Sequence, residues 1–168
     1  MTIEHDFFGV LGSDDESGEL YWSDTAELGD QNVDVDVSSP DEESVSSEAL
    51  DIVAAMINAL EELDSQARES LVADLSAEVS VTSQFITAQF DELDDEVLED
   101  ALIWDSGDKQ IDFLRSIQLQ RIGFHPHHIG ADQHFAVLDY SISPHETDAL
   151  LVVTLDVHGD TIGIAADS

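Results

Sequence analysis

Cysteine is absent from this sequence, and basic side chains are scarce. Without cysteine the chain cannot form a disulfide, use a thiol as a nucleophile or build a zinc site from thiolates. Four cations, Arg68, Lys109, Arg115 and Arg121, face 39 acidic residues, and the formal net charge is −35. Nucleic acid is a poor partner for such a chain, because binding it requires protein cations in place of the phosphate counterions. Anionic membrane surfaces are excluded on the same ground, whereas basic proteins and metal cations are attracted.

Long hydrophobic runs are missing as well. The opening MTIEHDFFGV has neither the basic start nor the apolar core of a signal peptide. The longest apolar run, IVAAMINAL, is interrupted by Asn58 and is too short to cross a bilayer. We therefore expect a cytoplasmic protein. A hydrophobic fraction of 42% in 168 residues predicts one globular domain, residues 1–168, and nothing in the pattern indicates an oligomeric state.

The amino-terminal part, residues 1–38, predicts a three-stranded β-meander. Its strands are expected at DFFGVLG, ELYWSDTAEL and NVDVDVS, separated by turn residues. In residues 33–37 valine alternates strictly with aspartate, which predicts a sheet with one dry and one wet face. An acidic, serine-rich linker at residues 39–46, which contains Pro40, ends the meander.

The middle of the chain, residues 47–115, has a helical hydrophobic period, with Leu50, Val53 and Ile57 on one face. We expect five helical segments here: one capped by Ser46 or Ser47, one capped by Asp64–Ser65, one over TSQFITAQFDEL, a short one from Asp94–Asp95 through Trp104, and a last turn or two at DKQIDFL.

The carboxy-terminal part, residues 116–168, predicts four antiparallel strands at SIQLQRIGF, HFAVLDYSIS, ALLVVTLDV and TIGIAA. A slip in the alternation predicts a β-bulge near Arg121, and His158–Gly159 predicts a hairpin turn. Arg115 and Arg121 are expected to pair with carboxylates, with Arg121 in a buried ion pair. The order of strands, helices and strands predicts an α+β fold, with seven strands in antiparallel sheets and helices packed on them.

The motifs in this order resemble a bacterial family called domain of unknown function 2004. The resemblance is carried by HDFFGVL, ELYWSDTAEL with NVDVDVS, the amphipathic middle, and a close of RIGFHP, FAVLDYSIS and DALLVVTLDVHGDTIGIAAD. It would cover nearly the whole chain, and its motifs are strands and turns. The resemblance therefore implies a fold and no activity.

A histidine-rich loop, FHPHHIGADQHF, is the main candidate site. It contains four of the seven histidines. If its flanking strands pair, Phe124 and Phe135 meet at the base. The side chains that could then act as ligands for zinc, nickel or copper are His125, His127, His128, Asp132 and His134. The competing interpretations are a solvated polar loop and a pH-responsive patch, in which surrounding carboxylates raise the histidine pKa values.

Catalytic signatures are absent from the sequence, and no catalytic or cofactor-binding residue is predicted. There is no G-x-S-x-G elbow, no H-E-x-x-H and no phosphate-binding loop. The acidic clusters at residues 14–16 and 91–100 could supply paired carboxylates, but solvated turns and helix ends are the expected role of such residues here. Phe7, Phe8, Tyr21, Trp22 and Trp104 could line a ligand pocket, and aromatic residues in short strands are more often core.

Two functions remain open, one suggested by the charge and the other by the histidine-rich loop. We expect a non-enzymatic interaction protein that binds a basic protein partner. One version is an immunity-like protein that blocks a basic toxin by presenting DNA-like negative charge. The alternative is a metal-binding protein that uses the loop at residues 125–134. The acidity itself is either functional or a solubility trait of the kind found in organisms that live with salt.

Overall fold

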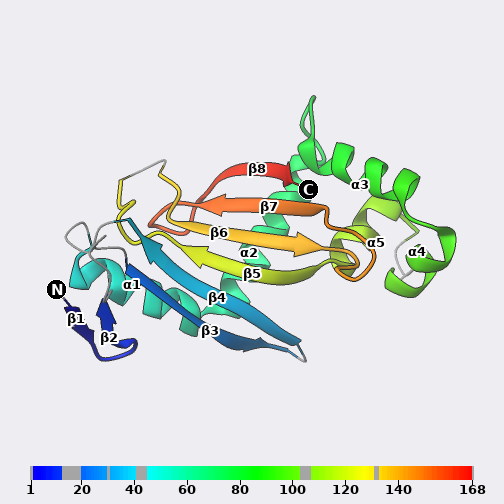
Figure 1. The fold of residues 1–168 in the computed structure, drawn as a ribbon. Coiled ribbons are helices and arrows are strands. Elements are labelled where there is room, and N and C mark those ends of the chain that lie inside the picture. Colours follow the sequence, from blue (N-terminus) through cyan, green and yellow to red (C-terminus); the bar gives the residue numbers. More distant parts are fainter. Residues whose placement is uncertain are drawn as a thin grey trace.

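The computed structural model describes residues 2–12, 20–29, 31–40, 45–102, 107–130 and 133–167, which form an α+β fold (Figure 1). The strands are β1 (Thr2–His5), β2 (Gly9–Gly12), β3 (Leu20–Leu28), β4 (Gln31–Ser39), β5 (Gln118–Phe124), β6 (Ala136–Ser141), β7 (Leu150–Leu155) and β8 (Thr161–Asp167). In this part of the chain, β1 and β2 form a separate hairpin, and the others form a six-stranded sheet in the order β3-β4-β5-β6-β7-β8.

The helices lie between β4 and β5. They are α1 (Ser47–Asn58), α2 (Leu60–Asp74), α3 (Val81–Glu92), α4 (Asp95–Ala101) and α5 (Lys109–Ser116). Three begin at a side-chain cap, as the sequence favours: Ser46 accepts from Ala49 N at 3.1 Å, Ser80 from Ser83 N at 3.0 Å, and Asp108 from Gln110 N at 2.9 Å. Of the two caps predicted for the first helix, Ser46 and Ser47, the structure has Ser46. The predicted end of the fourth helix, Trp104, lies outside the described residues.

The predicted start of the second helix at Asp64–Ser65 is wrong. Helix α2 begins one turn earlier, because Leu60 and Leu63 both face the core, at 4% and 6% exposure. Asp64 is therefore inside the helix. Its carboxylate accepts hydrogen bonds from Arg68 and Tyr140 instead of capping a helix end.

The strand count and the all-antiparallel arrangement also need correction, since the described residues contain eight strands and not seven. The first predicted strand, DFFGVLG, begins with a turn at residues 6–8, and only its last four residues form β2, which starts at Gly9 with a φ of +74°. The additional strand, β1, precedes that turn. Strands β4 and β5 pair in parallel, with Asp34 opposite Arg121 and Val37 opposite Phe124. The helices between them return the chain to the same end of the sheet, as a parallel connection requires.

The carboxy-terminal half agrees with the prediction. Strands β5 to β8 are joined as an antiparallel meander. The pairing of β5 with β6 shifts register between Leu119 and Arg121, where the bulge was predicted. The β7–β8 turn closes when Gly159 N donates to Asp156 O at 3.0 Å, and Gly159 has a φ of +83°, which favours glycine.

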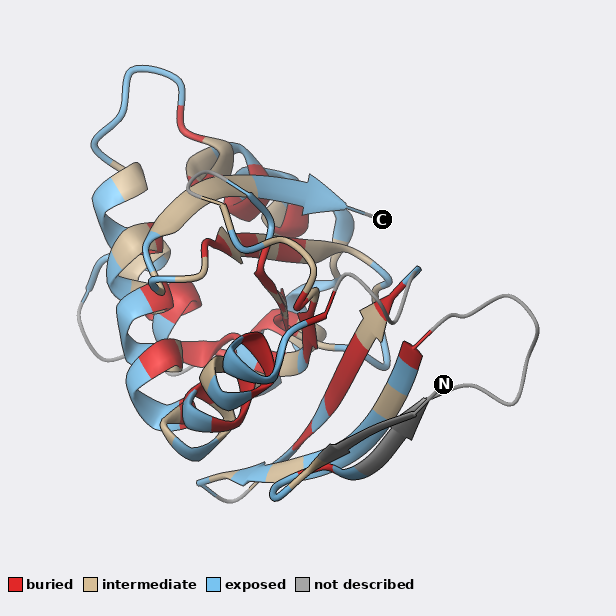
Figure 2. Ribbon diagram, turned by 90° about the vertical axis from the view of Figure 1, so that its left-hand side faces the viewer, coloured by how far each residue is buried: buried red, intermediate tan, exposed pale blue. Residues whose placement is uncertain are grey.

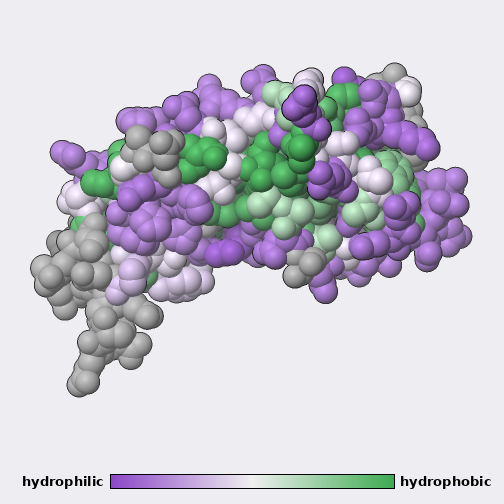
Figure 3. All heavy atoms as spheres, turned by 90° about the horizontal axis from the view of Figure 1, so that it is seen from above, coloured by the Kyte–Doolittle hydropathy of each residue, from purple (hydrophilic) through white to green (hydrophobic). Residues whose placement is uncertain are grey.

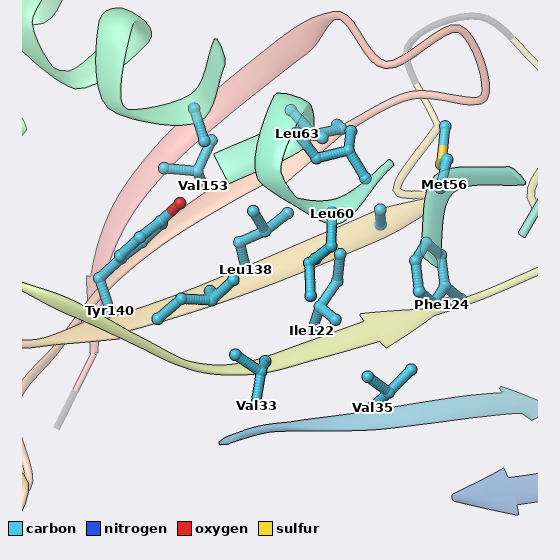
Figure 4. Close-up of a cluster of buried hydrophobic side chains, with 14 of the residues drawn as sticks. Val33, Val35, Met56, Leu60, Leu63, Ile122, Phe124, Leu138, Tyr140 and Val153 are labelled. Carbon is cyan, nitrogen blue, oxygen red and sulfur yellow. The ribbon is translucent and has the colours of Figure 1, made fainter. Parts of the chain in front are cut away.

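The core lies between the helices and one face of the sheet. Helices α1 and α2 lie behind the sheet in Figure 1, with α3 to α5 at its right-hand end, and Figure 2 shows buried residues gathered between helices and sheet. The valines of β4 are buried on this side, and so are Ile122, Leu138 and Val153, which meet Leu60 and Leu63 of α2 (Figure 4). Each such side chain contributes about 1.5–3 kcal/mol when it leaves water. The opposite face of the sheet carries no helix in the described part of the chain.

The β1–β2 hairpin attaches to the rest through an aromatic contact. The Phe8 ring meets the Trp22 ring of β3 edge to face, with centroids 4.8 Å apart, and Phe8 is buried. His5 Nε2 lies 2.7 Å from Asp51 Oδ1 of α1. Phe8 therefore belongs to the core, while Phe7 and Tyr21 are exposed.

Among the described helices, none combines the length and the apolar character that crossing a bilayer requires.

Candidate functional site: the histidine loop and its surroundings

The base of the histidine loop is closed, as predicted. His125 N donates to Phe135 O at 2.8 Å, and Phe135 N donates to Leu155 O at 3.0 Å. The rings of Phe124 and Phe135, both fully buried, meet edge to face with centroids 6.3 Å apart. Inside the loop, His128 N donates to His125 O at 2.9 Å and forms a tight turn around Pro126. The loop is thus anchored to the meander by backbone bonds and a buried aromatic pair.

Three of the predicted ligand side chains gather in the loop. The ring centroids of His127 and His128 lie 4.0 Å apart, and those of His125 lie 6.0 and 5.8 Å from them. His134 is exposed and takes part through its backbone: its carbonyl oxygen lies 3.0 Å from His128 Nδ1. Asp132 lies outside the described residues. The structure therefore brings together His125, His127 and His128.

The three rings differ in which nitrogen atom is not used in a hydrogen bond and could therefore bind a ligand. Because only a protonated nitrogen can donate to a carbonyl oxygen, the bond to His134 O places the hydrogen of His128 on Nδ1, so Nε2 is the atom with a free lone pair. His127 Nδ1 is buried and has no hydrogen-bond partner among the described residues. No group of three or more histidine or acidic side chains in the described ranges is placed to hold a metal ion as it stands.

The pKa values of two of these histidines move opposite to the expectation. Burial, followed by the neighbouring imidazoles, lowers the pKa of His125 below 6.5, and Arg121 adds to this while Asp36 opposes it. Burial, followed by His128, lowers the pKa of His127. The prediction that surrounding carboxylates raise these pKa values is therefore wrong for both residues. Local burial outweighs the distant negative charges, which water and salt screen.

An ion cluster lies beside the loop on the helix-free face of the sheet. Arg121 donates from Nη2 to Asp36 Oδ1 at 2.9 Å and from Nε to the other oxygen of the same carboxylate. Its Nη1 lies 3.7 Å from Asp139 Oδ2. The Asp36 and Asp139 side chains are 9% and 14% exposed, whereas the Arg121 side chain is 51% exposed. The predicted ion pair of Arg121 exists, with a buried Asp36, a partly buried Asp139 and a half-exposed Arg121 side chain.

The residues around this ion cluster leave space for it and adjoin a hollow on the same face of the sheet. A Cβ atom on Gly123 would lie 3.2 Å from Asp36 Oδ1 and 3.3 Å from Arg121 Nη2, so glycine leaves the space in which the pair forms. Burial raises the pKa of Asp139, and the charge of Arg121 opposes the rise. A shallow hollow of about 440 Å³ adjoins the pair; it is lined by Tyr21, Ser23, Asp24, Thr25, Asp34, Val35, Asp36 and Arg121.

The sequence did not predict a second polar network on the core side. Asp64 accepts from the buried Tyr140 hydroxyl at 2.8 Å and from Arg68 Nε at 3.1 Å, and Arg68 Nη1 donates to Leu114 O at 3.0 Å. The network borders a groove of about 610 Å³ between α2 and α5, which Arg115 also lines. Arg115 is exposed on α5, beside β5 as expected. The only sequence signal was the Asp64–Arg68 spacing of four on a helix.

The acidic clusters stay in solvent where they are described. Every acidic side chain of residues 91–100 is exposed, as expected for a solvated helix start. The cluster at residues 14–16 lies outside the described part of the chain.

Searches of protein-family models, of curated proteins and of solved structures find no match to this chain. The resemblance to domain of unknown function 2004 therefore remains a prediction.

Proposed function

We propose that this chain is a non-enzymatic interaction protein whose acidic surface binds a basic protein partner. The observation that carries the proposal is that two of the four cations already pair with carboxylates of the fold. Arg121 is shared by Asp36 and Asp139, and Arg68 is bound to Asp64. These pairs neutralise few of the 39 acidic residues, so the remaining surface attracts a cationic partner and accelerates its approach.

A third cation, Lys109, is exposed on α5 and contacts an aromatic ring. Lys109 Nζ lies 5.7 Å from the centroid of the Phe90 ring, in a cation–π contact. An immunity-like role is one form of the proposal: the protein would block a basic toxin, such as a nuclease, by offering negative charge in place of nucleic acid. An encoding gene beside a toxin gene would support that form.

Binding to a basic test protein, lysozyme, measured by calorimetry across a salt series, tests the proposal. The affinity is expected to fall steeply as salt rises, because opposite surface charges attract less when the Debye length shortens. The matched control replaces the exposed acidic residues of the 91–100 stretch by their amides, which makes the net charge less negative without changing the core. Affinity that is absent at low salt, or that does not change with salt, contradicts the proposal.

Metal binding by residues 125–134 is the second candidate function. The observation that favours it is the gathering of three imidazole rings with centroids 4.0 to 6.0 Å apart, together with the unpaired nitrogen of His127. Neutral imidazole nitrogen is a ligand for zinc and nickel, and the negative charge of the chain raises the local concentration of cations. Rotation of the rings would be needed to aim their nitrogen atoms at one ion.

Titration of the metal-stripped protein with zinc and with nickel tests this second candidate. The variant His125→Ala/His134→Ala is compared with His145→Ala/His158→Ala, which removes two exposed histidines outside the loop. Saturable one-to-one binding that the loop variant alone loses supports a site. Weak binding at many sites, shared by both variants, means that the carboxylates collect cations without selection and contradicts it.

A further inference from the structure

Strand β8 is an edge strand with little of the usual protection: α3 contacts it, its register shifts near Leu155 and it ends in Asp167, but the rest of the strand is uncharged. In the described part of the chain it pairs with β7 alone. Its first six residues, TIGIAA, carry no charge, although 26% of the chain is charged. Edge strands are normally protected by charged side chains, proline or a covering element, because their free N–H and C=O groups accept another strand. The opposite edge, β3, has such protection in Asp24 and Glu27.

The surface along this edge is apolar. Ile162 and Ile164 are partly exposed, and Ala165 and Ala166 are exposed. Seen from above, the side on which β8 borders the sheet, hydrophobic surface gathers in the middle of the molecule and hydrophilic surface surrounds it (Figure 3). A strand that added to β8 would therefore bury apolar side chains as well as pair its backbone.

A groove of about 260 Å³ continues this surface between β8 and α3. It is lined by Val81, Gln84, Phe85, Ala88, Gln89, Glu92, Ala149, Ala166 and Asp167. The positions on α3 recur at intervals of three and four, so the groove follows one face of the helix along its whole length. An extended segment that leaves the edge of β8 would run into it.

One residue in the groove has an unmet hydrogen bond. Gln89 is 1% exposed, and its Oε1 atom has no donor among the described residues. A buried acceptor without a donor is costly, and a donor supplied from outside relieves that cost. The groove is also lined by the carboxylates of Glu92 and Asp167 and by no lysine or arginine. Its chemistry therefore suits a segment that brings N–H donors and positive charge.

We propose that β8 and the groove beside α3 bind an extended basic segment of a partner protein. The segment adds to the sheet as a strand beside β8 and donates a hydrogen bond to Gln89 Oε1. The inference rests on the proposed function, since it names the surface on which the basic partner is bound. A second copy of this chain is the other occupant that could pair with an open edge, but two chains of charge −35 repel one another, whereas a basic segment is attracted.

The probe is a blocked ten-residue peptide of alternating lysine and valine. Its control has the same side chains but carries an N-methyl group on every residue, so it keeps the charge and has no N–H group with which to pair as a strand. Amide hydrogen exchange is followed along the chain. The plain peptide is expected to protect amides of β8, the methylated peptide to leave them unchanged, and neither to protect β3.

Matched variants separate the edge from the overall charge. Ala165→Lys/Ala166→Lys places two cations on β8, and Ser23→Lys/Thr25→Lys places two on exposed positions of the opposite edge. We expect the first variant to bind the peptide at least about tenfold more weakly than the second. Gln89→Leu, similar in shape but without the acceptor, is expected to weaken binding while the free protein melts no lower than the wild type.

The outcomes distinguish the docking surface at β8 from the proposed function as an acidic interaction protein. Equal affinities of the two lysine variants, or protection by the peptide elsewhere than β8, overturn the docking surface and leave the acidic interaction protein standing. Absence of any salt-dependent binding by the plain peptide overturns both. A dimer that sedimentation detects without peptide, and that Ala165→Lys/Ala166→Lys dissociates, overturns the basic segment as occupant and assigns the edge to a second copy.

Discussion

Replacing Arg121 by methionine tests how the helix-free face of the sheet is held together. The change keeps the apolar stem of the side chain and removes the guanidinium group. Asp36, with its side chain 9% exposed, then loses two hydrogen bonds, and Asp139, 14% exposed, loses its nearest cation. Two poorly solvated carboxylates of like charge are then left on either side of β5 without a cation between them.

The expected loss follows from the burial of the three groups. Removing one partner of a buried ion pair costs about 3–5 kcal/mol, because the other charge remains buried without compensation. The Arg121 side chain is 51% exposed, so water already weakens the pair, and we expect a loss of about 2–3 kcal/mol. For a chain of this length, that loss lowers the melting temperature by roughly 4–12 °C.

Urea denaturation at neutral pH, followed by circular dichroism, measures the effect. The control is Arg115→Met, which makes the same change of net charge at an exposed position on α5 and is expected to cost less than about 0.5 kcal/mol. Adding Asp36→Asn to Arg121→Met should restore part of the lost stability, because the amide removes one of the two unpaired charges. If Arg121→Met loses no more than Arg115→Met, the cluster does not stabilise the fold and the reasoning is refuted.

Three further outcomes are expected. Tyr140→Phe removes the hydroxyl that donates to Asp64 and should lower the free energy of unfolding by about 1–2 kcal/mol in urea melts, whereas Tyr21→Phe, at an exposed position, should change it by less than about 0.5. Because burial lowers the pKa of His125 and His127, the folded state binds fewer protons than the unfolded chain as the pH falls through about 6.5. The free energy of unfolding should therefore be unaffected by these groups above that pH and fall below it. A variant with glutamine at both positions should lose less over the same range in pH-dependent denaturation. The melting temperature should rise between about 0.01 and 1 M salt, as the Debye length falls from about 30 to 3 Å, and a flat calorimetric profile would contradict the picture of unneutralised surface charge.

Local patterns predicted the fold wherever one face of an element is buried. The alternation in NVDVDVS yields β4, whose valines are buried, and the slip near Arg121 yields the bulge in β5. The parallel pairing of β4 with β5 could not be predicted, because the hydrophobic period of a strand does not say which end of the sheet the chain re-enters. The separate β1 was missed because TIEH is too short to show a period.

The sequence predicted the position of the histidine loop but not the pKa values of its histidines. Pairing of the flanking strands was enough to place Phe124 against Phe135 and to bring His125, His127 and His128 together. The direction of their pKa shifts was not predictable, since the sequence reports the number of carboxylates and not the burial of a ring. The Tyr140–Asp64 bond joins β6 to α2 across a long stretch of sequence, which no local spacing reveals.

The parallel joint between β4 and β5 has a consequence for the order in which the molecule folds. Strands β3 and β4 form a hairpin, and β5 to β8 pair with sequence neighbours, so both units can assemble from local contacts. The pairing of β4 with β5 forms later, because the chain between Ser39 and Gln118 is a long loop. The entropy cost of closing that loop is paid before the contacts between the two strands form. We therefore expect an intermediate in which both sub-sheets exist and the central seam is open. In that intermediate, the inner edges of β4 and β5 are the unpaired strands through which two chains could exchange halves.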